Sequence, residues 1–115
     1  THHADLYRRM QNSPFKIPGA TFGWVDATFS ALRQCFDPLA LARLTVPTLV
    51  LGGTEERVVD GDAMRKWVKL AGEHAKGEIQ LRLVNGAKRE LFSELPEYYG
   101  MAVAAVNAWF SPHLR

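Results

Sequence analysis

The sequence predicts an α/β fold in which a small parallel sheet is flanked by helices. Beginning at Val46, the stretch V-P-T-L-V-L-G-G is an apolar run bounded by proline and glycine, which is typical of a strand buried on both faces. Residues 78–84 alternate between apolar and polar, as a half-exposed edge strand does. A helical pattern separates the two segments, so a crossover helix can join them in parallel.

The composition indicates a single globular unit. The chain has 115 residues, 47% of them hydrophobic, and a net charge of +2 that leaves no basic stripe for nucleic acid. No run approaches the ~18 apolar residues of a membrane span, and no signal-peptide pattern is present. Cys35 has no partner for an internal disulfide, so we expect a small buried residue and a cytoplasmic setting. Because the chain opens at Thr1 without a methionine, we expect a fragment or a processed product.

The N-terminal end is predicted to be a short helix over residues 4–11 followed by a loop that contains Pro14 and Pro18. His2 and His3 precede this helix, but adjacent histidines lack the spacing of a helical metal pair. We therefore expect an exposed terminus there, and we predict neither a metal nor a cofactor for the chain.

A second helix is predicted from the N-cap Thr21 to about Phe36, because its apolar residues recur at three- and four-residue spacing. Asp37 and Pro38 then start a further short helix through Leu44, with the proline in a first-turn position that has no hydrogen bond to lose.

Two more helices are predicted around the strands. Asp60 or Asp62 can cap the helix between them, whose apolar positions share one face. The last helix opens at Pro96 and runs to about Phe110, and its high apolar content predicts that it is largely buried against the sheet.

Two loops carry a resemblance to a known family. The first strand runs into L-V-L-G-G-T-E-E-R-V-V-D, which ends at Asp60, and G-A-K-R-E-L-F-S-E follows the second strand and ends at Glu94. These segments resemble the L-I-L-x-A-G-x-D-R-V-V-D and G-A-x-H-E-L-x-x-E loops of α/β-hydrolases of the lysophospholipase and monoacylglycerol lipase type. The resemblance implies the C-terminal half of that fold: a partial hydrolase sheet of two parallel strands with flanking helices, residues 45–115, preceded by a cap- or lid-like helical segment, residues 1–44.

The resemblance also assigns candidate site residues. It places Glu56 at the position of the triad acid, where the family usually has aspartate, and Arg89 at the position of the triad histidine. Because arginine stays protonated, it cannot accept a proton from a serine, and we expect Glu56 and Arg89 instead to approach each other as an ion pair. The alternative is that both are solvated loop charges. Glu55 and Asp60 are alternative acids, although Asp60 is better explained as a helix cap.

Phe22 and Trp24 are candidate substrate-binding residues. The segment I-P-G-A-T-F-G-W-V, which contains both, resembles the family segment that begins a lid or cap helix, and this implies that they line an acyl-chain pocket. The alternative is ordinary packing, because aromatic stripes on helices are usually part of a core.

Hydrolysis by this fold needs a serine on a G-x-S-x-G elbow, and no serine of the chain lies in such a motif. The resemblance therefore predicts the C-terminal portion of a lysophospholipase-like serine hydrolase, inactive alone, whose lipid-ester substrate would bind to the complete enzyme. The missing N-terminal half would be its partner. The alternative is a non-catalytic interaction module that self-associates through an uncovered apolar sheet edge.

Overall fold

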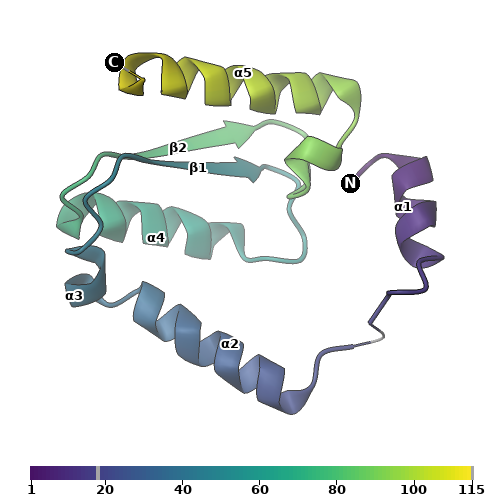
Figure 1. The fold of residues 1–115 in the computed structure, drawn as a ribbon, viewed down its shortest axis with the longest axis horizontal. Helices are drawn as coiled ribbons and strands as arrows, with labels where there is room; N and C mark the ends of the chain where they lie inside the picture. The colour runs from purple at the N-terminus through teal and green to yellow at the C-terminus, as the bar shows by residue number, and fades with distance from the viewer. Residues whose placement is uncertain (18, 115) are drawn as a thin grey trace.

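Two parallel strands, β1 (Thr48–Gly53) and β2 (Ile79–Val84), form the sheet of the computed structural model, which describes residues 1–17 and 19–114 (Figure 1). In the register, Thr48 pairs with Ile79 at the start of the strands and Gly53 pairs with Val84 at their end. This confirms the predicted parallel pairing. Because both strands end at the same edge, the loops that follow them leave the sheet side by side.

Helices cover both faces of this sheet. The crossover helix α4 (Gly61–His74) lies on one face and α5 (Pro96–His113) on the other (Figure 1). As predicted, Asp60 caps α4, because its side chain accepts a hydrogen bond from the Asp62 N–H. The core lies between β2, the loop after it and α5. Its buried members are Val84, Ala87, Leu91 and Ala102, with Leu51 and Tyr98 packed against them.

The first part of the chain is helical, as predicted. Helix α1 (Ala4–Gln11) and helix α2 (Phe22–Cys35) form an arc to one side of the sheet, and the short α3 (Pro38–Leu41) leads into β1 (Figure 1). The Thr21 and Asp37 side chains cap α2 and α3, respectively. Pro18, in the predicted loop, lies outside the described residues.

Two features of the helical part differ from the prediction. Helix α3 ends at Leu41, three residues short of the expected Leu44. A 3₁₀ turn, η1 (Leu91–Ser93), stands in the loop before α5 and was not anticipated, because its hydrogen bonds come from that loop's own backbone.

The predicted burial of β1, Cys35 and α5 is wrong. Only the last two residues of β1 are buried, Cys35 is exposed on α2, and in α5 Ala102 alone is buried while Met101 is 53% exposed. For β1 and α5, the physical reason is the width of the sheet, whereas α2, which carries Cys35, does not lie on the sheet (Figure 1). A face of two strands is narrow and contacts only one stripe of a helix, so apolar residues on the rest of the helix surface remain exposed to solvent. No helix within the described ranges is both long and apolar enough to cross a membrane.

The end of β1 requires glycine. A Cβ added at Gly53 would collide with the Ala87 carbonyl oxygen and would lie 2.5 Å from the Lys88 carbonyl oxygen, both in the loop after β2. Real Cβ atoms do not approach other atoms so closely. The absence of a side chain at this position therefore allows the two loops to contact each other.

We expect Gly53→Ala to lower the free energy of unfolding by about 1–3 kcal/mol or more, because the backbone of one loop must move. The control is Gly72→Ala in α4, where an added Cβ meets nothing within 4 Å. It should raise the free energy of unfolding by about 0.5–1 kcal/mol. Urea denaturation followed by circular dichroism measures both. Equal effects of the two substitutions would contradict the close approach of the loops.

Candidate functional site

The loops after β1 and β2 are joined at the carboxyl edge of the sheet. The Glu55 N–H donates to the Ala87 carbonyl at 2.9 Å, and the Thr54 N–H donates to the Val84 carbonyl at 3.1 Å. The Thr54 hydroxyl also accepts from the Gly86 N–H at 2.8 Å. Gly86 has a φ of +79°, which glycine adopts without strain. These bonds fix the position of Glu56 relative to Arg89.

Glu56 has one oxygen that is held by its own loop and one that has no partner. Its Oε1 accepts from the Val58 N–H at 2.5 Å and the Val59 N–H at 3.0 Å. Its Oε2 is buried and has no hydrogen-bond partner among the residues that the structure describes. Burial raises the pKa of Glu56, but the hydrogen bonds from these backbone N–H groups and the charge of Arg89 lower it by more. Glu56 is therefore ionised at neutral pH.

Arg89 lies near Glu56 but pairs with a different carboxylate. Its Nε is 3.6 Å from Glu90 Oε1, and both side chains are about half exposed. In the described part of the chain, Glu90 is the acid within ion-pair distance of Arg89, so the expected direct pair with Glu56 is not formed. The reason is local. Glu90 is the next residue in the same loop, whereas Glu56 turns one oxygen toward the N–H groups of its own loop.

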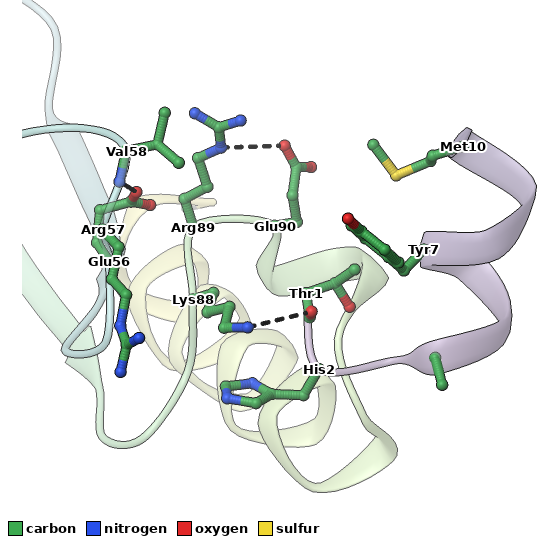
Figure 2. Close-up of a pocket in the computed structure, with 11 residues that line it drawn as sticks. Thr1, His2, Tyr7, Met10, Glu56, Arg57, Val58, Lys88, Arg89 and Glu90 are labelled. Atoms are coloured by element: carbon green, nitrogen blue, oxygen red, sulfur yellow. Dashed lines mark hydrogen bonds and ion pairs between the residues drawn. The ribbon is translucent and has the colours of Figure 1, made fainter.

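Glu56 and Arg89 nevertheless line the same two cavities. The larger, of about 660 Å³, lies between the two loops and the N-terminal segment, residues 1–10 (Figure 2). The smaller, of about 150 Å³, lies between the end of β1 and the start of α4, where Met64 forms one wall. The structure therefore brings Glu56 and Arg89 together at the carboxyl edge of the sheet.

Phe22 and Trp24 lie elsewhere. Phe22 is 98% exposed, and Trp24 lines a shallow surface hollow with Ile17 and Thr21. Neither belongs to the core, so ordinary packing does not explain them. Neither lines the two cavities that Glu56 shares with Arg89. Their role in an acyl-chain pocket stays a prediction.

The sequence reasoning missed a buried carboxylate, Glu94, which holds the N-terminal segment. The residue is 4% exposed, and its two oxygens accept from the His2 backbone N–H at 2.9 and 2.8 Å. The His2 ring Nδ1 is 3.2 Å from Glu94 Oε2, and its Nε2 is 3.3 Å from Glu55 Oε2. His2 was expected in an exposed terminus, but its ring lies between two carboxylates and 5.6 Å from the Tyr98 ring.

The ionised form of Glu94 is favoured by these contacts. Burial raises its pKa, but the His2 and Leu95 N–H groups and the His2 ring together lower it by more, so the pKa lies below the ordinary 4.5. A sequence signal for this residue existed, because Glu94 is the last glutamate of the segment that resembles G-A-x-H-E-L-x-x-E. An acid that closes an otherwise apolar turn is a candidate for a buried hydrogen-bond acceptor.

The chemistry of the site is that of binding and charge orientation. The residues found to line the two shared cavities include no serine or cysteine. Within residues 1–17 and 19–114, no three His, Cys, Asp or Glu side chains form a group that could hold a metal ion. The groups in place are an ionised acid, Glu56, and the neighbouring cations Arg57, Lys88 and Arg89.

Comparison with known proteins shows a partial sequence similarity. The chain is 35% identical over 72 residues to monoglyceride lipase from Homo sapiens, which covers 63% of this chain and 23% of the lipase. No protein-family model matches the chain. Together with the parallel strands and their crossover helix, this similarity supports an α/β-hydrolase-like relationship. The matched region spans less than a quarter of that relative's length.

We expect Glu94→Gln to reduce stability at neutral pH by about 1–3 kcal/mol, because hydrogen bonds to a charged acceptor are lost. The pKa of Glu94 in the folded state lies below 4.5, so its ionised form stabilises the fold above pH 4.5. This contribution is lost as the pH falls through the folded-state pKa. Urea denaturation between pH 7 and pH 3 should therefore show a shallower loss of stability in Glu94→Gln than in the unsubstituted chain.

The matched control for Glu94 is Glu73→Gln, an exposed acid on α4. It should change stability by less than about 0.5 kcal/mol and leave the pH profile as it is. A Glu94 variant that behaves like the Glu73 variant would contradict the anchoring role.

Proposed function

We propose that the chain is the C-terminal portion of a lysophospholipase-like serine hydrolase that acts on carboxylic esters of lipids. In this proposal, residues 45–115 contribute the acid-bearing end of the hydrolase sheet and residues 1–44 contribute the cap. The observation that carries the proposal is Glu56, an ionised acid just beyond the end of β1 whose buried Oε2 has no partner in the described structure.

A triad acid has two requirements. It must be ionised, and it must offer an oxygen to the N–H of the base that it orients. Glu56 meets the first, because its own loop stabilises its charge, and its unpaired Oε2 is available for the second. The loop that faces it carries Arg89 at the position where the resembling family has histidine. The similarity to monoglyceride lipase over 72 residues supports a lipase-like hydrolase segment.

The proposal includes inactivity of the chain alone. Arginine is protonated at neutral pH and cannot take a proton from a nucleophile. No serine of the chain lies in a G-x-S-x-G motif. The nucleophile and the base would therefore come from residues outside this sequence, and the chain would supply the acid, the cap and the last helix. Phe22 and Trp24, which are exposed here, would contact the acyl chain in the complete enzyme.

A second candidate function is a self-associating interaction module. One observation favours it: β1 and β2 pair only with each other in the described structure, and large apolar side chains of the neighbouring helices are exposed. An unpaired strand edge is a template for pairing with another chain. The missing half of a hydrolase would cover the same edge, so the two functions differ in what binds there.

Light scattering after size-exclusion chromatography tests the uncovered edge that both candidates share. A self-associating module should elute with at least twice the mass of one chain at concentrations near 10 µM. A monomer at that concentration would count against both candidates, whereas a G-x-S-x-G elbow encoded upstream of Thr1 would favour the hydrolase portion alone.

We expect Arg89→His to create an imidazole with a raised pKa, because Glu56 Oε2 can accept its N–H and an adjacent carboxylate stabilises the charged ring. Nuclear magnetic resonance titration, compared with the unsubstituted chain, identifies the added resonance. Its pKa should lie above the ordinary ~6.5 and should fall when Glu56→Gln is introduced as well.

The control in the same background is Glu90→Gln. Because Glu90 is half exposed, Glu90→Gln should lower the raised pKa of the introduced imidazole by less than Glu56→Gln does. An introduced imidazole that titrates near 6.5 whether or not Glu56 is present would overturn the assignment of Glu56 as the acid.

A further inference from the structure

Besides the loop after β1, the larger cavity has two walls that differ in chemistry. One wall is the loop after β2, which carries the cations Lys88 and Arg89. The other is α1, whose Tyr7 and Met10 side chains face the loop across the cavity (Figure 2). Tyr7 and Met10 are three positions apart and share one face of α1, and each is about half exposed. A cavity with a cationic wall and an apolar wall is complementary to an amphiphile with an anionic headgroup.

The cationic wall has unused hydrogen-bond donors. Arg89 uses its Nε toward Glu90, and its two terminal amino groups have no hydrogen bond to a residue that the structure describes. Lys88 Nζ is 3.5 Å from the Thr1 carbonyl, which is a long contact for an ammonium group. A guanidinium presents its donors as a planar fork that matches a carboxylate or a phosphate. These groups can therefore donate hydrogen bonds to an anionic ligand without breaking a strong internal hydrogen bond.

The charge of the cavity also favours an anion. Three cations line it, Arg57, Lys88 and Arg89, against the two acids Glu56 and Glu90. The Glu56 carboxylate is already stabilised by backbone N–H groups, which leaves Glu90 as the acid that competes with a ligand for Arg89. The volume of about 660 Å³ is within the roughly 300–1,000 Å³ that is usual for small-molecule sites.

We propose that this cavity binds a single-chain amphiphile with an anionic headgroup, with the headgroup on Arg89 and Lys88 and the alkyl chain against Tyr7 and Met10. Binding of this kind needs neither a nucleophile nor a base. The proposal therefore goes beyond the proposed function and holds whether or not the chain is part of a hydrolase. A neutral ester of the same chain length lacks the charge that the loop after β2 recognises.

Isothermal titration calorimetry on the 115-residue chain tests this proposal with three ligands below their aggregation concentrations: decanoate, decyl phosphate and the neutral monodecanoylglycerol. We expect at least one of the two anions to bind ten or more times more tightly than the neutral ester, and the anion that binds more tightly identifies the headgroup. Equal affinity for all three, or no binding of either anion, would overturn the proposal.

Substitutions on the cationic wall test the site itself. Arg89→Gln should weaken binding of the preferred anion at least about tenfold, because a charge-assisted hydrogen bond is lost. Glu90→Gln should tighten it, because Arg89 loses its competing partner. The matched control is Arg65→Gln, an exposed arginine on α4 away from the cavity, which should leave affinity unchanged. Equal effects of Arg89→Gln and Arg65→Gln would place the ligand elsewhere.

The apolar wall has its own test. Lengthening the ligand from hexanoate to decanoate should raise the affinity, by up to about fourfold for each buried methylene. Met10→Ser should reduce this gain, and circular dichroism verifies that each variant is folded. A chain-length dependence that is unchanged in Met10→Ser would remove α1 from the site. Because the test of Glu56 as an acid measures an imidazole pKa rather than ligand binding, failure of one proposal is distinguishable from failure of the other.

Discussion

The pairing of β1 with β2 in parallel is the constraint on which the rest of the structure depends. Parallel strands end at the same edge, so two loops that are separated in the sequence by a helix and a strand leave the sheet together. The glycine at the end of β1 allows the backbones of these loops to bond directly. Glu56, Lys88 and Arg89, which lie in these two loops, owe their positions to this contact.

Carboxylates in this chain act according to their surroundings. Glu56 and Glu94 both lie near cationic groups or rings, yet both are stabilised mainly by backbone N–H groups. The two carboxylates differ in whether an oxygen is left without a hydrogen-bond partner. Both oxygens of Glu94 are occupied, so it anchors a segment, whereas Glu56 keeps one oxygen without a partner in the described structure. An anchor and a candidate acid are thus distinguished by their unused hydrogen-bonding capacity.

The helix caps were predictable from the sequence, whereas burial was not, because burial depends on residues far along the chain. The caps at Thr21, Asp37 and Asp60 follow from side chains that bond N–H groups two or three positions away. Burial of Cys35 was predicted from its apolar neighbours, but it depends on whether another element covers α2. The apolar pattern of a helix shows that a face can be buried, not what buries it.

The contact between His2 and Glu94 joins residues 92 positions apart. On the ribosome, His2 is made 92 residues before Glu94, so α1 remains without its anchor while the intervening segment is synthesised. Contacts between residues so far apart in the sequence form late. Closing the intervening loop costs conformational entropy before the contacts can stabilise the structure. We therefore expect docking of the N-terminal segment to be a late step in folding, and the cavity between α1 and the loop after β2 to form together with it.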